Sequence, residues 1–143
     1  MGNGFGRVKK NAALLSVLLL AGCATGARWG DTHREKLLSA TNGYTTLLRW
    51  REFDKACVNF VEESVRGKCL ERAQTLNDLR ITDIRTRDLD FRTDGVEVTA
   101  TVEMEYYLLP SLVVRKIQDR QLWLCRGPDE GRVCRIITPL PAF

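Results

Sequence analysis

The hydrophobic positions of this chain follow a helical period up to about residue 78 and a period of two from Leu79 onward. In residues 31–50 the apolar positions recur at three and four residues, which is typical of a helix that buries one face. They are Leu37, Leu38, Thr41, Tyr44, Leu47 and Leu48. Thr32 and Glu35 have the spacing of a capping box, and Asp31 adds negative charge at a helix start. The pattern predicts a long first helix over residues 31–50.

Two shorter helical segments follow the first. The second segment keeps the same period at Phe53, Ala56, Cys57, Phe60 and Val61. Gly67 interrupts the pattern, because glycine lowers the stability of a helix. We therefore expect a third short helix over residues 68–76, which would bring Cys69 back toward Cys57.

Alternation in the second half of the chain predicts a sheet. The clearest strand covers residues 96–109 and has two chemically different faces. The apolar face carries Val96, Val98, Ala100, Val102, Met104, Tyr106 and Leu108, and the polar face carries Glu97, Thr99, Thr101, Glu103, Glu105 and Tyr107. Residues 93–95 supply turn chemistry, so residues 80–91 are the expected antiparallel partner, with a bulge between Ile84 and Leu89.

Two further strands, over about residues 113–126 and 132–138, complete the predicted sheet. Helices first and strands afterwards indicate an α+β domain, in which two to three N-terminal helices pack on a four-stranded antiparallel curved sheet. The long helix is expected to cover one face of that sheet.

A family resemblance follows from the ends of these elements. The first helix ends in Tyr44-x-x-Leu47-Leu48-Arg49-Trp50, Phe53-x-x-Ala56 comes next, and the chain closes with Pro139-Leu140-Pro141-Ala142-Phe143. The order resembles the nuclear transport factor two-like fold, which is shared by SnoaL-like cyclases, ketosteroid isomerases and many binding domains. The resemblance covers nearly all of residues 31–143 and implies a cone-like domain with a cavity between helix and sheet. A cystatin-like arrangement is the alternative, and the second and third helical segments count against it.

The start of the chain has the three parts of a secretory signal. Arg7, Lys9 and Lys10 form a basic front, residues 12–20 are apolar, and small residues precede a cysteine in Leu20-Ala21-Gly22-Cys23. An apolar segment of this length is too short to span a membrane, which takes about 20 residues. The tetrapeptide resembles the lipobox of bacterial lipoproteins, in which the cysteine thiol receives a diacylglyceryl group and a signal peptidase cleaves just before it. The new amine is then often acylated, for example with palmitate. The alternative is an ordinary cleaved signal or a short anchor, with Cys23 incidental.

The lipobox resemblance implies a division of the chain. Residues 1–22 would be the signal peptide, residues 23–30 a lipidated N-terminus and tether, and residues 31–143 a single domain. Ala24 follows the cysteine, whereas in enteric bacteria an aspartate there retains a lipoprotein in the inner membrane. The expected location is therefore the cell envelope, at the outer membrane facing the periplasm.

Removal of the predicted signal peptide nearly neutralises the chain. Residues 1–22 hold three of the 22 Lys and Arg residues and none of the 18 Asp and Glu residues, so 121 residues with 19 basic and 18 acidic side chains remain. That length suits one compact domain. Non-specific nucleic-acid binding depends on an excess of basic residues facing phosphates, so no nucleic-acid partner is expected.

Four cysteines besides Cys23 form an even set in an exported chain, which favours disulfides. They are Cys57, Cys69, Cys125 and Cys134, and they allow three pairings. We favour Cys57–Cys69 between two helical segments and Cys125–Cys134 across a hairpin, which would also place Trp123 opposite Ile136. No Cys-x-x-Cys spacing is present, so no metal site is expected.

Few side chains are candidates for catalysis. His33, the only histidine, falls in the first turn of the predicted helix, where a solvated side chain is the favoured interpretation. The glutamates of strand 96–109 fit a solvated or salt-bridged sheet face better than an acid pair. Asp119, beside Arg120, is the best remaining carboxylate, and a structural ion pair is favoured over a base. We assign no catalytic residue and no cofactor.

The three tryptophans also have competing roles. Trp50 and Trp123 are expected in the core, whereas Trp29, near the tether, could touch lipid headgroups or a partner. Two functions from different classes remain. The favoured one is a lipid-anchored envelope protein whose non-enzymatic domain binds an envelope protein or a small apolar ligand. The alternative is an isomerase, cyclase or dehydratase of the same fold with an unidentified base in its cavity.

Overall fold

The computed structural model describes residues 25–93, 95–128 and 131–143, and side chains from Thr32 onward. The predicted signal peptide, Cys23 and the side chain of Trp29 lie outside the described residues. The chain divides into two units after Asp31, and the packing described below is that of the second unit, Thr32–Phe143. None of the helices among the described residues is long and apolar enough to cross a membrane.

The first helix, α1, runs over Thr25–Arg49. Its buried stripe recurs at helical spacing and comprises His33, Leu37, Thr41, Tyr44, Thr45 and Leu48. The helix begins six residues before the predicted start at Asp31, so most of the predicted tether has helical backbone. No proline lies between Thr25 and Asp31, and once a packed helix exists each added residue gains a hydrogen bond. The Thr32 capping signal therefore lies inside the helix.

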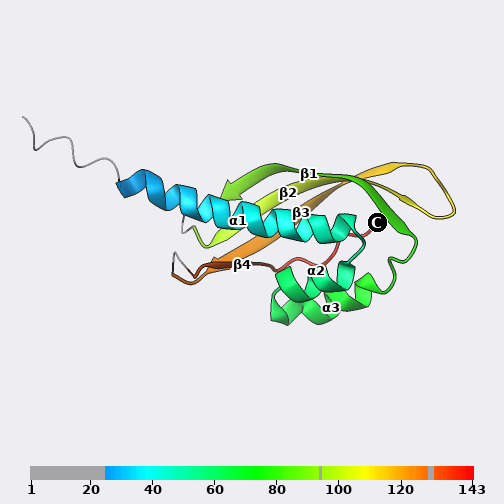
Figure 1. Ribbon diagram of the computed structural model, residues 1–143, viewed down its shortest axis with the longest axis horizontal. Helices are drawn as coiled ribbons and strands as arrows, with labels where there is room; N and C mark the ends of the chain where they lie inside the picture. The colour runs from blue at the N-terminus through cyan, green and yellow to red at the C-terminus, as the bar shows by residue number, and fades with distance from the viewer. Residues whose placement is uncertain (1–24, 94, 129–130) are drawn as a thin grey trace, which may run out of the picture. The chain divides into compact units, whose positions relative to one another are not determined.

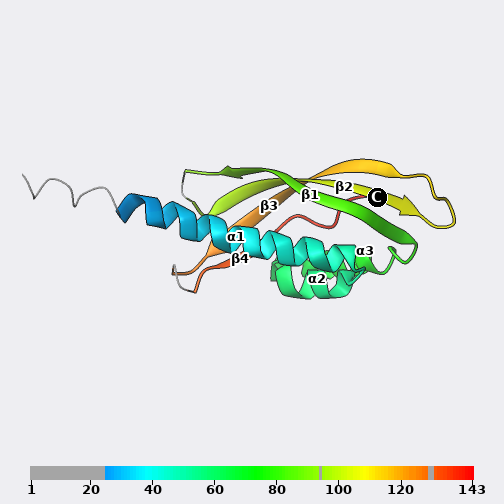
Figure 2. The same cartoon turned by 45° about the horizontal axis from the view of Figure 1, so that its top comes forward.

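The sheet has four antiparallel strands in the order β1-β2-β3-β4, which confirms the predicted α+β class with the helices before the sheet. The strands are β1 Leu79–Phe91, β2 Glu97–Leu108, β3 Arg115–Arg126 and β4 Val133–Ile136. Figures 1 and 2 show α1 lying along one face of this curved sheet. The alternating apolar side chains of β2, from Val98 to Tyr106, are buried on that face as expected.

The register of the sheet agrees with most of the sequence prediction. The β1–β2 pairing shifts between Ile81 and Asp83 and again between Thr86 and Asp88. The second shift confirms the bulge predicted between Ile84 and Leu89. On the other side of the sheet, Trp123 pairs with Ile136, as predicted.

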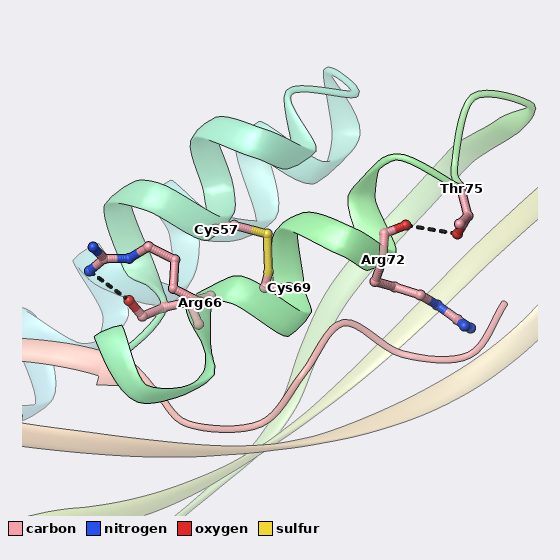
Figure 3. Close-up of a disulfide and its surroundings, with 6 residues drawn as sticks. Cys57, Arg66, Cys69, Arg72 and Thr75 are labelled. Carbon is pink, nitrogen blue, oxygen red and sulfur yellow. Dashed lines mark hydrogen bonds between the residues drawn. A yellow bond between two sulfur atoms is a disulfide. The ribbon is translucent and has the colours of Figure 1, made fainter.

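The helices α2 (Phe53–Phe60) and α3 (Glu63–Ala73) are tied to each other and to β4. The Cys57–Cys69 disulfide joins the two helices, and Figure 3 shows it between them. The same close-up includes Arg66, whose guanidinium donates a hydrogen bond to the carbonyl of Val61. Val61 forms a parallel bridge with Ile136, so the short link between the helices continues the sheet beyond β4.

Both disulfides have the pairing that the sequence favoured. Cys57 and Cys69 have Cα atoms 5.7 Å apart, and Cys125 and Cys134 face each other across the β3–β4 hairpin with Cα atoms 4.0 Å apart. All four residues are buried. A bridge of this kind typically contributes about 2–4 kcal/mol, mainly by restricting the unfolded chain.

Two glycines inside helices have different surroundings. Gly67 lies within α3, which begins at Glu63 rather than at the predicted residue 68. The helix tolerates it because the cost of one glycine, about 1 kcal/mol, is smaller than the gain from packing and the disulfide. A Cβ atom at Gly67 would have no neighbour within 4 Å, whereas one at Gly43 would lie 2.5 Å from Cζ of Phe60.

We predict that Gly67→Ala raises the free energy of unfolding by about 0.5–1 kcal/mol, because alanine favours the helix and meets no other group. Gly43→Ala is the matched control. Its helix gain is offset or exceeded because the Phe60 ring must move away from α1. Chemical denaturation followed by circular dichroism measures both variants, and an equal gain in the two would contradict the close packing of Phe60 on Gly43.

Candidate functional site

The inner face of β3 carries a chain of buried polar side chains. Gln121 Nε2 donates a hydrogen bond of 2.8 Å to Oδ2 of Asp119, and Nε1 of Trp123 donates one of 3.2 Å to Oε1 of Gln121. Gln121 and Trp123 are fully buried and Asp119 is 9% exposed. The three residues alternate along the strand, so all three side chains point from the sheet toward α1.

Tyr44 of α1 lies opposite this polar chain. Its ring meets the Trp123 ring edge-on, with centroids 5.9 Å apart, and only 1% of Tyr44 is exposed. Burial raises the pKa of the Tyr44 phenol far above its ordinary value, and the negative charge of Asp119 raises it further. Tyr44 therefore stays protonated at every physiological pH.

The same environment acts on Asp119. Burial raises the pKa of its carboxyl above the ordinary value, and the hydrogen bond from Gln121 opposes that rise. A carboxyl with a raised pKa near a neutral tyrosine is the pairing by which some enzymes combine a base with a hydrogen-bond donor. Here, however, the bonded carboxylate oxygen is held by an amide inside the fold, and the tyrosine is sealed from solvent.

The prediction of a structural ion pair for Asp119 is wrong, and the adjacent Arg120 lies on the other face of the sheet. Successive side chains of a strand point to opposite faces, so Asp119 faces α1 while Arg120 lies on the outer face of the sheet. There Arg120 lines a groove of about 370 Å³ together with Asp88 and Asp90. Within the described residues, Asp119 has a hydrogen bond from Gln121 and no ion pair.

The prediction that His33 is solvated is also wrong. His33 is 8% exposed and belongs to the buried stripe of α1. Because α1 begins at Thr25, His33 lies in the third turn rather than the first, where the helix faces the β1–β2 connection. A Cβ atom at Gly95 of that connection would lie 3.6 Å from Nδ1 of His33.

The glutamates of β2 form the salt-bridged face that the sequence indicated. Glu103 lies 2.7 Å from Arg87 and 3.3 Å from Lys116, and Lys116 also lies 3.1 Å from Glu105. Hydrogen bonds from Arg87 and Lys116 lower the pKa of Glu103, so it remains ionised. Glu97 pairs with Arg92. The outer face is thus held by cross-strand charge pairs rather than by an acid pair suited to catalysis.

The two described tryptophans have opposite environments. Trp123 is in the core, as predicted, whereas Trp50 is 74% exposed and its predicted burial is wrong. α1 ends at Arg49, and Arg51 has a left-handed backbone with φ of 62°. The chain therefore turns at Trp50, and the periodicity that indicated a buried position no longer applies there.

Sequence reasoning missed Gln121 and the partnership of Tyr44 with Asp119. The sequence did hold a signal for Gln121. Trp123 was expected in the core, and because residues two apart in a strand share a face, Gln121 had to point inward as well. The electrostatic effect of Asp119 on Tyr44 acts between residues 75 positions apart and depends on the tertiary fold. No three His, Cys, Asp or Glu side chains of the described residues gather closely enough to hold a metal ion.

Three grooves on the described surface are lined by other residues than the buried polar chain. One is beside the start of α2, one is on the outer face of the sheet, and one lies between α1 and the β3–β4 hairpin. None of these three includes Asp119. Comparison with known proteins gave no matching family model, no matching curated protein and no matching solved structure.

We predict that Asp119→Asn makes the protein more stable at pH 7. Asparagine keeps an acceptor for Gln121 but carries no charge to desolvate. Between about pH 4, where an unfolded aspartate titrates, and its raised native pKa, the folded wild type binds more protons than the unfolded chain. Its free energy of unfolding therefore falls as pH rises through that window, whereas this dependence is absent from the variant.

Urea denaturation of both proteins from pH 3 to pH 8 tests this expectation. The stabilities should converge at pH 3, where the wild-type carboxyl is protonated in both states. A variant less stable than the wild type at pH 7 would show that the Asp119 carboxylate is stabilised by more than the amide of Gln121.

Proposed function

We propose that this chain is a lipid-anchored lipoprotein of the bacterial cell envelope whose small domain binds a partner or ligand and does not catalyse a reaction. The observation that carries the binding assignment is the inward position of Asp119, which is 9% exposed and accepts a hydrogen bond from Gln121. The carboxyl best suited to act as a base faces a buried amide, a buried indole and a buried phenol.

The hydrogen bond from Gln121 competes with a substrate for the candidate base. A general base must come within hydrogen-bond reach of the proton that it removes, at about 2.6–3.2 Å or through one water. At Asp119, Gln121 Nε2 already occupies one carboxylate oxygen, and the neighbouring Tyr44 is closed to solvent. Binding at the surface of the domain is therefore a better supported function than catalysis in its interior.

The membrane part of the proposal rests on Leu20-Ala21-Gly22-Cys23 and on the two disulfides. The tetrapeptide matches the lipobox pattern, and paired cysteines suit an oxidising compartment such as the periplasm. Two or three acyl chains would hold the protein firmly, since each buried methylene contributes about 0.8 kcal/mol. Ala24 in the position after the cysteine favours the outer membrane.

An enzyme of the nuclear transport factor two-like class is the second candidate. The observation in its favour is the raised pKa of Asp119 beside the protonated Tyr44. Such an enzyme would need an opening movement between α1 and β3 that lets a substrate reach both groups.

We predict that mass spectrometry of the mature protein finds Cys23 as an acylated first residue. Cys23→Ala should release the protein from membranes or block its processing, whereas Ala24→Ser, the control, should leave lipidation unchanged. Ala24→Asp should move the protein toward the inner membrane in an enteric host. A free thiol at Cys23 in membrane-bound protein would refute the anchoring mechanism.

We predict that Asp119→Asn and Tyr44→Phe each restore the envelope phenotype of a deletion strain as well as the wild type does. Both substitutions keep the shape of the side chain and remove one catalytic capability. Loss of a true general base lowers a rate by about 10²–10⁴-fold, which complementation at low expression should detect. If either folded, lipidated and normally abundant variant fails, the enzyme assignment replaces the binding assignment.

A further inference from the structure

A groove of about 420 Å³ lies between α1, the end of α2 and β4. Figures 1 and 2 show these three elements side by side. The volume falls within the range of pockets that accept small organic ligands, about 300–1,000 Å³. Its two sides differ in chemistry, one being basic and the other apolar.

The basic side carries three cationic side chains. Lys36 of α1 and Arg132 and Arg135 of the β3–β4 hairpin line the groove, and no acidic residue is among the described side chains that line it. Lys36 is exposed, and it has no ion pair within the described residues. This differs from the outer face of the sheet, where Arg87 and Lys116 are paired with glutamates.

Arg135 is held in place but keeps donors for a ligand. One of its guanidinium nitrogens donates to the carbonyl of Asn59 at the end of α2. A guanidinium carries five N–H donors, and within the described residues Arg135 has no further partner. The bond to Asn59 fixes the side chain at the groove, so the entropy cost of ordering it for a ligand is reduced.

The apolar side is formed by Ala40, Gly43 and Phe60. The Phe60 ring packs edge-on against Tyr44 with centroids 6.3 Å apart, which anchors it to the core. Gly43 lets that ring lie directly on α1, since a Cβ atom there would meet it at 2.5 Å. A ligand in the groove would therefore meet fixed apolar surface beside the cations.

We infer that this groove binds a phosphate group carried on an apolar body, with Lys36 and Arg135 as the phosphate ligands and Phe60 as the apolar contact. Guanidinium groups bind phosphate oxygens through two parallel hydrogen bonds, and an ammonium adds a point charge. Two cations beside one groove favour an anionic phosphate over a zwitterionic headgroup. The inference gives a ligand class to the proposed binding function and rests on it.

The phosphate could come from an anionic phospholipid headgroup or from a soluble phosphate compound. Calorimetric titration of the purified full-length protein in zwitterionic detergent distinguishes these sources. The probes are dihexanoyl phosphatidylglycerol, dihexanoyl phosphatidylcholine and inorganic pyrophosphate, all at one ionic strength, because screening weakens exposed charge interactions.

We predict that phosphatidylglycerol binds at least about tenfold more tightly than phosphatidylcholine, which corresponds to about 1.4 kcal/mol. Lys36→Glu and Arg135→Gln should each weaken that binding about tenfold or more. Lys68→Glu is the matched control, because it makes the same charge change on an exposed residue of α3 away from the groove, and it should change the affinity less than about twofold.

Several outcomes decide the inference. Pyrophosphate binding as tight as that of phosphatidylglycerol, and lost in Lys36→Glu, would support Lys36 as a phosphate ligand and identify a soluble source, but it would overturn Phe60 as the apolar contact. Equal weakening by Lys36→Glu and Lys68→Glu would overturn it, because only net charge would matter. No binding of any probe would also overturn it, while the lipidation and complementation results would still decide the proposed function separately.

Discussion

The edge-on contact between Tyr44 and Trp123 is the interaction on which the arrangement of the domain depends. It fixes α1 against the inner face of the sheet, and the second contact of Tyr44, with Phe60, fixes α2 to the same helix. Aromatic pairs of this geometry contribute about 0.5–1.5 kcal/mol beyond the area that they bury. Through Tyr44, the long helix α1 is therefore connected both to the sheet and to the disulfide-linked helices α2 and α3.

The buried amide of Gln121 makes that aromatic packing compatible with an acid in the interior. An isolated carboxylate is costly to bury, and a hydrogen bond recovers only part of the cost. Gln121 satisfies Asp119 and at the same time accepts from the indole of Trp123. The polar chain therefore orients the tryptophan on which Tyr44 packs, which gives Asp119 a structural role in the core.

Local sequence patterns predicted the helices, the strands and the strand pairing, but they did not predict which side chains near the helix ends are buried. Alternation in β2 identified the inner face of that strand, because side-chain direction repeats every two residues, and the expected Cys125–Cys134 pair placed Trp123 opposite Ile136. Periodicity could not show that α1 stops at Arg49 and exposes Trp50, or that its early start puts His33 on the buried stripe. The groove beside Phe60 was likewise unpredictable, since its sides come from three segments far apart in the sequence.

Residues 25–143, with 19 basic and 18 acidic side chains, are nearly neutral in total, but their charges are unevenly distributed over the fold. On the outer sheet face, cross-strand pairing places Arg87 and Lys116 next to Glu103, so the charges there cancel over a few ångströms. Beside Phe60, the helix and the hairpin bring Lys36 and Arg135 together without such compensation among the described residues. Total charge therefore argues against a long polyanion such as nucleic acid, yet it does not argue against one small anion. The sheet register thus pairs opposite charges on the outer face, whereas no described carboxylate pairs with Lys36 or Arg135.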